Sequence, residues 1–361
     1  MRHFALLIVL LMITCRLVGQ DKIQLTKQYD MTSGSGDSHG YYQTIIDKYD
    51  VDQSYNIDVQ KVEKRYDGKR AIVRYEEHIS IDNSVPQLRG GMPNTLNISI
   101  PYKDDLYKIH LVRNHVKSPA YQIGSSDRQG ISSSEVALYQ GVVIGQKDSW
   151  ATLSIYDGKF RILLATPHGD IMVRHYEGDQ YSIYCQSDIV ISKSKSCDIS
   201  NANVSTAKRV GQTGSRVGSD CIEIYLEIDH QSYLDNGSSV GNTEVWAMSL
   251  MNDVSTIYNT IDVSIVVSSV FIWTQPDPYR DLENTFLMRD EFIQRITDQY
   301  DGRLAQLLST RDVGGGLAYG LGGFCGSYGD FPGPYFVTTG LDADYDAYPD
   351  YSFSVKVIAH E

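Results

Sequence analysis

The first half of the chain alternates apolar and polar residues with a period of two, which is typical of half-buried β-strands. The alternation is clear at residues 71–81, 95–102 and 106–112. A denser series of short apolar runs follows, at residues 142–144, 151–156, 160–165, 171–173 and 181–184. Between them lie the turn dipeptides Asp157-Gly158, His168-Gly169 and Glu177-Gly178. Evenly spaced strands with glycine-containing turns predict an antiparallel sandwich or a barrel-like domain.

The pattern changes after residue 221, where strand-like and helix-like segments alternate. Strands are predicted at residues 222–228, 261–273, 304–308, 314–320 and 335–339. Helices are predicted near residues 245–258, 283–296 and 352–361. Strands that alternate with helices favour an α/β domain with a mixed sheet.

Two of these helices have capping residues and an apolar face. The helix near 245–258 begins with the capping sequence Asn242, Thr243 and Glu244, and its core face carries Val245, Met248, Met251, Val254 and Tyr258. The helix at 352–361 is capped by Ser352 or Ser354, and its core face carries Val355, Ile358 and Ala359.

A segment of distinct composition separates the β-rich half of the sequence from the half in which strands and helices alternate. Residues 192–218 are rich in Ser, Lys, Gly and Asn and contain Lys208, Arg209 and Arg216. Exposed basic residues in such a linker are open to proteolysis, although they are also common in linkers that are never cut. We therefore expect a β-rich domain at 21–200, a linker and processing region at 201–219, and a second domain at 220–361.

The N-terminus carries a secretory signal. Arg2 is followed by an apolar run at residues 4–13, which is too short to span a bilayer but suits the core of a signal peptide. We expect residues 1–20 to be removed and the protein to be secreted. Acylation of Cys15 as a lipoprotein is an alternative, although Thr14 is a poor fit to the small residue expected before an acylated cysteine.

The net charge of the protein bears on which classes of partner it can bind. The protein has 32 basic and 45 acidic residues, giving a net charge of −13. Nucleic acids and anionic membranes are bound through basic patches, so neither is expected as a partner. No segment after the signal is apolar enough to cross a membrane.

The residues with catalytic chemistry are His360 and Glu361, the last two of the sequence. In the sequence pattern HExxH, two histidines one helical turn apart bind zinc, and the glutamate beside the first acts as general base. Only the first half of that pattern is present here. A His-Glu pair alone is weak evidence, because such pairs arise by chance and a histidine in an apolar helix is often a core residue.

The order of several sequence blocks strengthens the case. The blocks are residues 222–230 (IEIYLEIDH), 305–308 (AQLL), 316–319 (GLAY), 324–327 (FCGS) and 351–361 (YSFSVKVIAHE). Together they resemble the reprolysin (adamalysin) branch of the metzincin metallopeptidases, which includes the ADAM-like enzymes, and most closely the bacterial secreted members. Residues 149–158 and 160–164 resemble the propeptide of that family. The resemblance thus implies a zymogen with a β-rich propeptide and a zinc endopeptidase domain.

Site residues follow from the resemblance. It implies His360 as a zinc ligand, Glu361 as the base, and a substrate-cleft strand formed by Gly316, Leu317, Ala318 and Tyr319. The other zinc ligands are expected beyond residue 361, so we expect residues 220–361 to be an incomplete catalytic domain that is inactive by itself. Protein or peptide substrates are implied as partners. An ordinary edge strand is the alternative for residues 316–319.

Further expectations concern latency and a second metal. The latency hypothesis is that a propeptide thiolate, from Cys197 or Cys185, binds the zinc until processing. The alternative is a disulfide between these two cysteines, or one with Cys221, in an oxidising compartment. The resemblance also suggests a structural calcium ion near Glu223 and Asp301.

Two other functions compete with this interpretation. For the whole protein, the alternative function is a non-catalytic secreted binding protein with a degenerate protease-like domain. A serine or cysteine hydrolase is disfavoured, because Cys325 and Ser327 lack evident His/Asp partners and no GxSxG sequence occurs.

Overall fold

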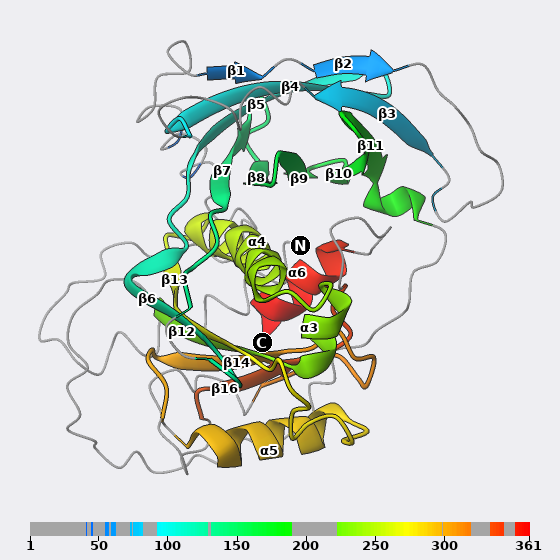
Figure 1. Cartoon of the computed structure of the whole chain (residues 1–361). Helices are drawn as coiled ribbons and strands as arrows, with labels where there is room; N and C mark the ends of the chain where they lie inside the picture. The colour runs from blue at the N-terminus through cyan, green and yellow to red at the C-terminus, as the bar shows by residue number, and fades with distance from the viewer. Residues whose placement is uncertain are drawn as a thin grey trace, which may run out of the picture.

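The computed structural model describes residues 41, 45, 55–57, 59–62, 73, 75–81, 92–128, 131–189, 222–297, 299–318, 333–342 and 351–361. Two β-sheets lie on either side of helices α4 (Val240–Asn259) and α6 (Tyr351–His360), and helix α5 (Thr285–Ile296) covers the outer face of the second sheet (Figure 1). Several predicted features lie outside the described residues. They are the signal peptide with Cys15, the linker at 201–219, residues 324–327, and Cys197, Cys221 and Tyr319.

The first sheet has ten strands in the order β1-β4-β5-β7-β8-β9-β10-β11-β3-β2. All neighbouring strands run antiparallel except β1 and β4. The strands are β1 (Tyr55–Ile57), β2 (Val59–Val62), β3 (Glu76–Ile81), β4 (Thr95–Tyr102), β5 (Asp105–Arg113), β7 (Ala137–Val143), β8 (Trp150–Tyr156), β9 (Lys159–Thr166), β10 (Gly169–Glu177) and β11 (Gln180–Cys185).

This sheet is strongly curved, because strands that are distant in its order meet across its inner face. The backbone N–H of Cys185 in β11 donates to the Tyr102 hydroxyl in β4 at 3.0 Å, and β2 also contacts β4. Alternate residues of each strand point inward and form one apolar core, as the period of two predicts. The described strands thus form one barrel-like sheet rather than two stacked sheets.

The predicted turns are confirmed. Asp157 and Gly158 join β8 to β9 with φ angles of 49° and 72°. Both angles lie in the left-handed region, as a two-residue type I′ hairpin turn requires. Gly178, between β10 and β11, has a φ angle of 60°.

The second sheet has the order β15-β16-β14-β12-β13-β6 and is mixed, as predicted. Neighbouring strands are parallel except for the antiparallel pair of β15 and β16. Its strands are β6 (Lys117–Ser125), β12 (Ile222–Ile228), β13 (Ile265–Ile272), β14 (Leu304–Leu308), β15 (Gly316–Ala318) and β16 (Tyr335–Thr338). A short helix, α3 (His230–Asp235), follows β12.

Both predicted helix caps were wrong. Helix α4 begins at Val240, one turn earlier than predicted, because Ser239 caps it by accepting from the N–H of Asn242. Helix α6 begins at Tyr351, so Ser352 and Ser354 both lie inside it. The Ser354 hydroxyl instead accepts from the N–H of Asp342 at 3.0 Å and fixes the segment that precedes the helix.

Strand β6 was not predicted. The polypeptide leaves the first sheet after β5, adds β6 in parallel to the edge strand β13 of the second sheet, and returns to the first sheet as β7. The pairing places Gln122 opposite Ser269 and Ile123 opposite Val270. A segment from the first half of the sequence therefore completes the sheet of the second half.

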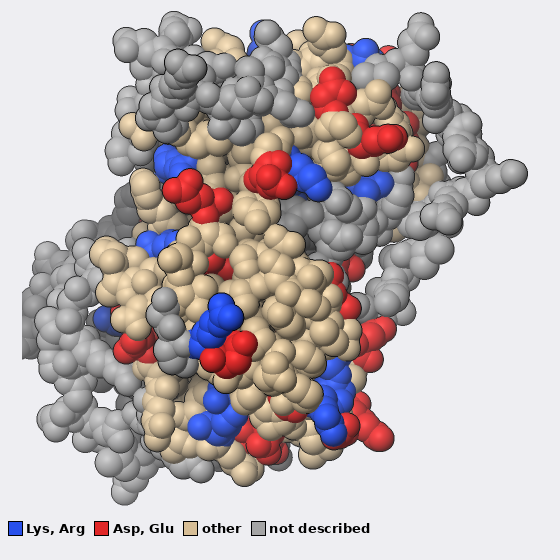
Figure 2. All heavy atoms as spheres, in the orientation of Figure 1, with Lys and Arg blue, Asp and Glu red and all other residues tan. Residues whose placement is uncertain are grey.

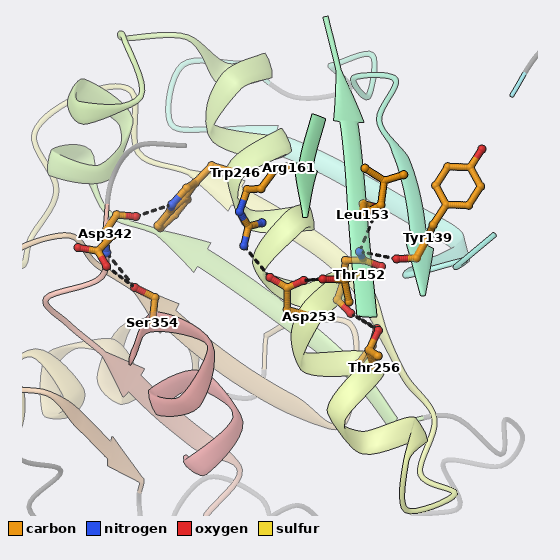
Figure 3. Close-up of polar contacts among 11 residues, drawn as sticks. Tyr139, Thr152, Leu153, Arg161, Trp246, Asp253, Thr256, Asp342 and Ser354 are labelled. Atoms are coloured by element: carbon orange, nitrogen blue, oxygen red, sulfur yellow. Dashed lines mark hydrogen bonds and ion pairs between the residues drawn. The ribbon is translucent and has the colours of Figure 1, made fainter. Parts of the chain in front are cut away.

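Helix α4 packs against both sheets. Its predicted apolar face is buried, with Val245, Met248, Met251 and Val254 each no more than 2% exposed. Its polar residues Glu244, Asn252 and Asp253 are no more than 1% exposed, because the N-terminal part covers them. Arg161 on β9 forms an ion pair with Asp253 at 2.7 Å, and Thr152 on β8 donates to the same carboxylate (Figure 3).

The surface carries charges of both signs. On the face drawn in Figure 2, the described acidic and basic side chains are interspersed rather than gathered in one basic patch. Among the described residues, no helix is long and apolar enough to span a bilayer. Whether nucleic acid is excluded as a partner stays a prediction.

The substitution Asp253→Ala tests the buried pair. It leaves the Arg161 guanidinium buried without this carboxylate, so we expect the free energy of unfolding to fall by roughly 3–5 kcal/mol. Urea denaturation at neutral pH measures the loss. The matched control is Asp281→Ala, whose side chain is 82% exposed and pairs with Arg280 at 3.0 Å. The control should change stability by less than about 0.5 kcal/mol, and equal losses would contradict the structural role of the buried pair.

Candidate active site

Helix α6 is fixed on two sides. Its predicted core residues Val355, Ile358 and Ala359 are no more than 4% exposed. The Tyr258 hydroxyl of α4 donates to the Ala359 carbonyl at 2.8 Å, directly before His360. On the other side, Lys356 forms an ion pair with Asp170 of β10 at 3.0 Å. Both the neighbouring helix and the N-terminal sheet therefore hold the end of α6 in place.

His360 is the last residue of α6 and is partly buried. Burial lowers the pKa of its imidazole below the usual value, because the charged form loses solvation. The imidazole is therefore neutral at physiological pH and keeps a lone pair, which is the form that binds metal ions.

Glu361 lies against strand β15. Its carboxylate occupies the space that a side chain at Gly316 would need. Burial raises the pKa of Glu361 to about 7, although a hydrogen bond from the Ala318 backbone acts in the opposite direction. A carboxyl group with a pKa close to the working pH can both accept and release a proton, as a general base requires.

The predicted cleft strand therefore lies beside the predicted base. Gly316 pairs with Thr338, and Ala318 pairs with Phe336 on β16. Within the described strands β15 is the last in the order of the second sheet. Its outer edge is the one that could pair with an extended peptide, while Leu317 is buried.

The candidate latency cysteine Cys185 lies in the core of the N-terminal sheet. It is 5% exposed, carries a free thiol, and accepts a hydrogen bond from the Ser187 hydroxyl at 3.1 Å. Its proposed disulfide partners Cys197 and Cys221 lie outside the described residues, so the disulfide alternative stays a prediction. A thiol in this core would have to leave it before it could bind a metal, and its role in latency stays a prediction.

The two residues that follow the candidate calcium residue Asp301 lie against the backbone of the other candidate, Glu223. Gly302, next to Asp301, packs against the carbonyl of Glu223, and the N–H of Arg303 donates to that carbonyl at 2.7 Å. Among the described residues, however, no group of three or more His, Cys, Asp or Glu side chains could hold a metal ion. The calcium site stays a prediction.

Comparison with known proteins supports a proteolytic function. Residues 221–329 match the sequence model of the Reprolysin (M12B) family zinc metalloprotease. This segment is of the reprolysin type. The match covers the reprolysin-type strands β12 to β15 but ends before His360 and Glu361, so these two residues remain assigned by their own sequence and geometry.

Comparisons over the full length are weaker. No curated protein sequence matches this one. Metalloproteinase-II from Bacteroides fragilis is similar over 70% of this protein and 77% of its own length, with 14% identity and a TM-score of 0.38. A chaperone-substrate complex is similar over 34% of this protein and 97% of its own length, with 12% identity and a TM-score of 0.23. Similarities at these levels do not establish a shared fold for the whole protein.

Zinc fits the described residues in part. His360 supplies one neutral imidazole, and Glu361 lies beside it as a carboxyl group that can exchange a proton near pH 7. The other zinc ligands stay a prediction from the resemblance to the reprolysin family.

The contact between Gly316 and Glu361 was not predicted, and it can be tested. Substitution of Gly316 by alanine would force the Glu361 carboxylate out of its place beside β15. A misplaced catalytic group can lower activity about 100-fold, so we expect kcat/KM for peptide hydrolysis by the processed full-length gene product to fall by about that factor.

The control for this substitution is Gly237→Ala. Gly237 has a φ angle of 72°, so alanine strains the backbone there, but the added side chain meets only the end of Asn242. The control therefore carries the general cost of replacing a glycine and should leave kcat/KM unchanged. Unchanged kcat/KM in Gly316→Ala would contradict the placement of Glu361.

Proposed function

We propose that this protein is a secreted zinc-dependent endopeptidase that is made as a zymogen. The observation that carries the proposal is the juxtaposition of Glu361, with a pKa raised to about 7 by burial, and the edge strand β15. This juxtaposition lies at the end of a helix that also carries His360, downstream of the reprolysin-type segment.

In this proposal His360 holds zinc together with ligands from the rest of the protein. Zinc, when bound, polarises the scissile carbonyl and makes water a stronger nucleophile at neutral pH. Glu361 accepts a proton from the attacking water at its carboxylate and delivers a proton to the leaving amine. Its raised pKa suits both steps, because neither protonation state is strongly favoured at pH 7.

The substrate binds as an extended peptide along β15. The outer edge of Gly316–Ala318 pairs with the peptide, a carbonyl of which replaces the Glu361 carboxylate as the acceptor of the Ala318 N–H, and the peptide bond to be cut then lies next to Glu361. Pairing through backbone groups orients a peptide without demanding a particular side chain at every position. This is the arrangement that hydrolysis of internal peptide bonds in varied proteins needs.

Secretion and latency complete the proposal. The apolar run at 4–13 supports export, and the basic residues at 201–219 support processing between the two parts of the protein. The N-terminal sheet contacts α6 through Asp170, and this contact gives the N-terminal part a means to influence the helix that carries His360.

Two substitutions test the assignment of roles. Glu361→Gln removes the base but keeps the size of the side chain, so hydrolysis by the processed full-length gene product should fall by about 10²–10⁴-fold while bound zinc is retained. His360→Ala should remove both activity and zinc. Hydrolysis of an internally quenched peptide and the zinc content of the purified protein are the two measurements.

The substitutions of Glu361 and His360 need a control, and one result would contradict the proposed function. Asp262 lies in a turn distant in sequence from the site, and Asp262→Asn should leave both activity and zinc content unchanged. A full-length wild-type protein that binds no zinc and cleaves no peptide would favour the alternative, a secreted binding protein with a degenerate protease-like domain.

Latency generates a separate prediction. The uncut protein should cleave peptides far more slowly than the protein cut within 201–219. If the Cys197 thiolate maintains latency, Cys197→Ser should be active before cutting, whereas Cys185→Ser should stay latent, because Cys185 is part of the N-terminal core. Peptide hydrolysis before and after the cut measures both effects, and equal latency in wild type and Cys197→Ser would refute the thiolate hypothesis.

A further inference from the structure

The N-terminal part of the protein holds the second part by two kinds of contact that do not involve the linker. The first is strand β6. It continues the second sheet beyond β13, with the N–H of Val267 donating to the Val116 carbonyl at 2.7 Å and the N–H of Ser126 donating to the Ile272 carbonyl at 3.0 Å. These backbone bonds stand at the two ends of the paired region, and the register between them shifts after the pair of Val267 and Lys117, so the strand is held at both ends.

The second contact is a set of hydrogen bonds to one buried carboxylate. Glu244, in the first turns of α4, is 1% exposed. Its carboxylate accepts from Lys117 at 2.8 Å, from the Tyr121 hydroxyl at 2.9 Å, from the Ser133 hydroxyl at 2.6 Å and from the N–H of Ser134 at 2.6 Å. All four donors come from β6 and the segment that follows it. Burial opposes ionisation of Glu244, but these hydrogen bonds outweigh it and hold its pKa below the usual value.

The rest of the polar face of α4 is bound in the same way. The Asn252 side chain accepts from Asn114 at 2.9 Å and donates to the Tyr139 carbonyl at 3.0 Å. The Asp253 carboxylate forms an ion pair with Arg161 and accepts a hydrogen bond from the Thr152 hydroxyl. These contacts each join a charged or polar group of α4 to one of the N-terminal part.

An interface that contains these polar contacts can keep the two parts of the protein together and can also allow them to separate. Breaking one buried charge pair is costly while the partners stay buried, so the two parts remain together under ordinary conditions. Charged and amide groups are well solvated once they reach water, so the polar face of α4 would not become an apolar patch after separation. Apolar contacts add to the hold, because Leu138, Leu163 and Met172 of the N-terminal part share one hydrophobic cluster with residues of α4.

We propose that the β13 edge and Glu244 form a strand-acceptor site that keeps the N-terminal part bound as a separate polypeptide after residues 201–219 have been cut. The occupant is the segment of residues 117–128 and 131–134, which supplies both the strand and the four donors. Cutting the linker removes none of the described contacts. Full release of the N-terminal part then requires a second event that breaks the pairing of β6 with β13 and the hydrogen bonds to Glu244. The proposal rests on the processing step of the proposed function, but not on catalysis.

The test uses the full-length gene product with a site for a sequence-specific protease placed within 201–219. After complete cutting, the two fragments should co-elute from a size-exclusion column at about 1 µM protein, roughly pH 7.5 and about 0.15 M salt. Glu244→Gln keeps the size of the side chain and removes its charge. It should weaken the complex at least about 10-fold, measured as the protein concentration at which half of the fragments separate.

Controls guard against loss of folding. Tyr121→Phe removes one hydrogen bond to Glu244 and should give a smaller weakening in the same direction. Glu283→Gln changes an exposed glutamate of the same domain and should leave the complex as tight as the wild type. The melting temperature of each uncut variant shows whether it folds, and if uncut Glu244→Gln does not fold, Tyr121→Phe carries the test.

The outcomes decide the proposal independently of protease activity. Co-elution in the wild type, with weakening in Glu244→Gln and Tyr121→Phe but not in Glu283→Gln, supports it. Separation of the wild-type fragments immediately after cutting would overturn it, and so would equal affinity in all folded variants. A protein that cleaves no peptide would disprove the proposed function and leave this result unaffected.

Discussion

The architecture depends on helix α4 having two buried faces. A helix of this length is about 30 Å long. Its apolar residues share one hydrophobic cluster with the second sheet and with Leu138 and Leu163 of the first sheet, and its polar residues bind the N-terminal part. The ion pair between Arg161 and Asp253 lies on the polar face. Since Tyr258 near the end of α4 also binds the Ala359 carbonyl, the position of His360 depends on this helix. The N-terminal sheet therefore supports the candidate site through α4 as well as through Asp170.

Local patterns predicted most of the elements. Strand β14 was placed at the residues that it occupies, and β4 and β12 were as well, because alternation and β-branched runs report burial directly. The turn at Asp157 and Gly158 followed from backbone conformations that few residues adopt. Helix starts were less certain, since Ser239 caps α4 although Asn242 and Thr243 are equally good capping residues by type.

Tertiary pairing explains what the sequence could not predict. Strand β6 contains Pro119 and several polar residues, and its partner β13 lies far along the sequence, at Ile265–Ile272. No local pattern records such a partner. The polar face of α4 would be expected in water, and only the presence of the N-terminal part shows that Glu244 and Asp253 are buried. By contrast, the burial of Cys185 could have been predicted, because Tyr181, Ile183 and Cys185 alternate along β11 and face the same core.

For the candidate site, the sequence placed β15, His360 and Glu361 in the correct order but not in contact. The contact depends on Gly316, whose missing side chain admits the Glu361 carboxylate. It also depends on which edge of the second sheet is open. Strand β6 covers the β13 edge, and Pro119 within β6 lacks the N–H that a further strand would need. Among the described strands, β15 is thus the edge best able to pair with a peptide, and it is the edge beside Glu361. In the proposed function, the N-terminal part occupies the other edge and leaves β15, beside Glu361, as the described edge to which an extended peptide can bind.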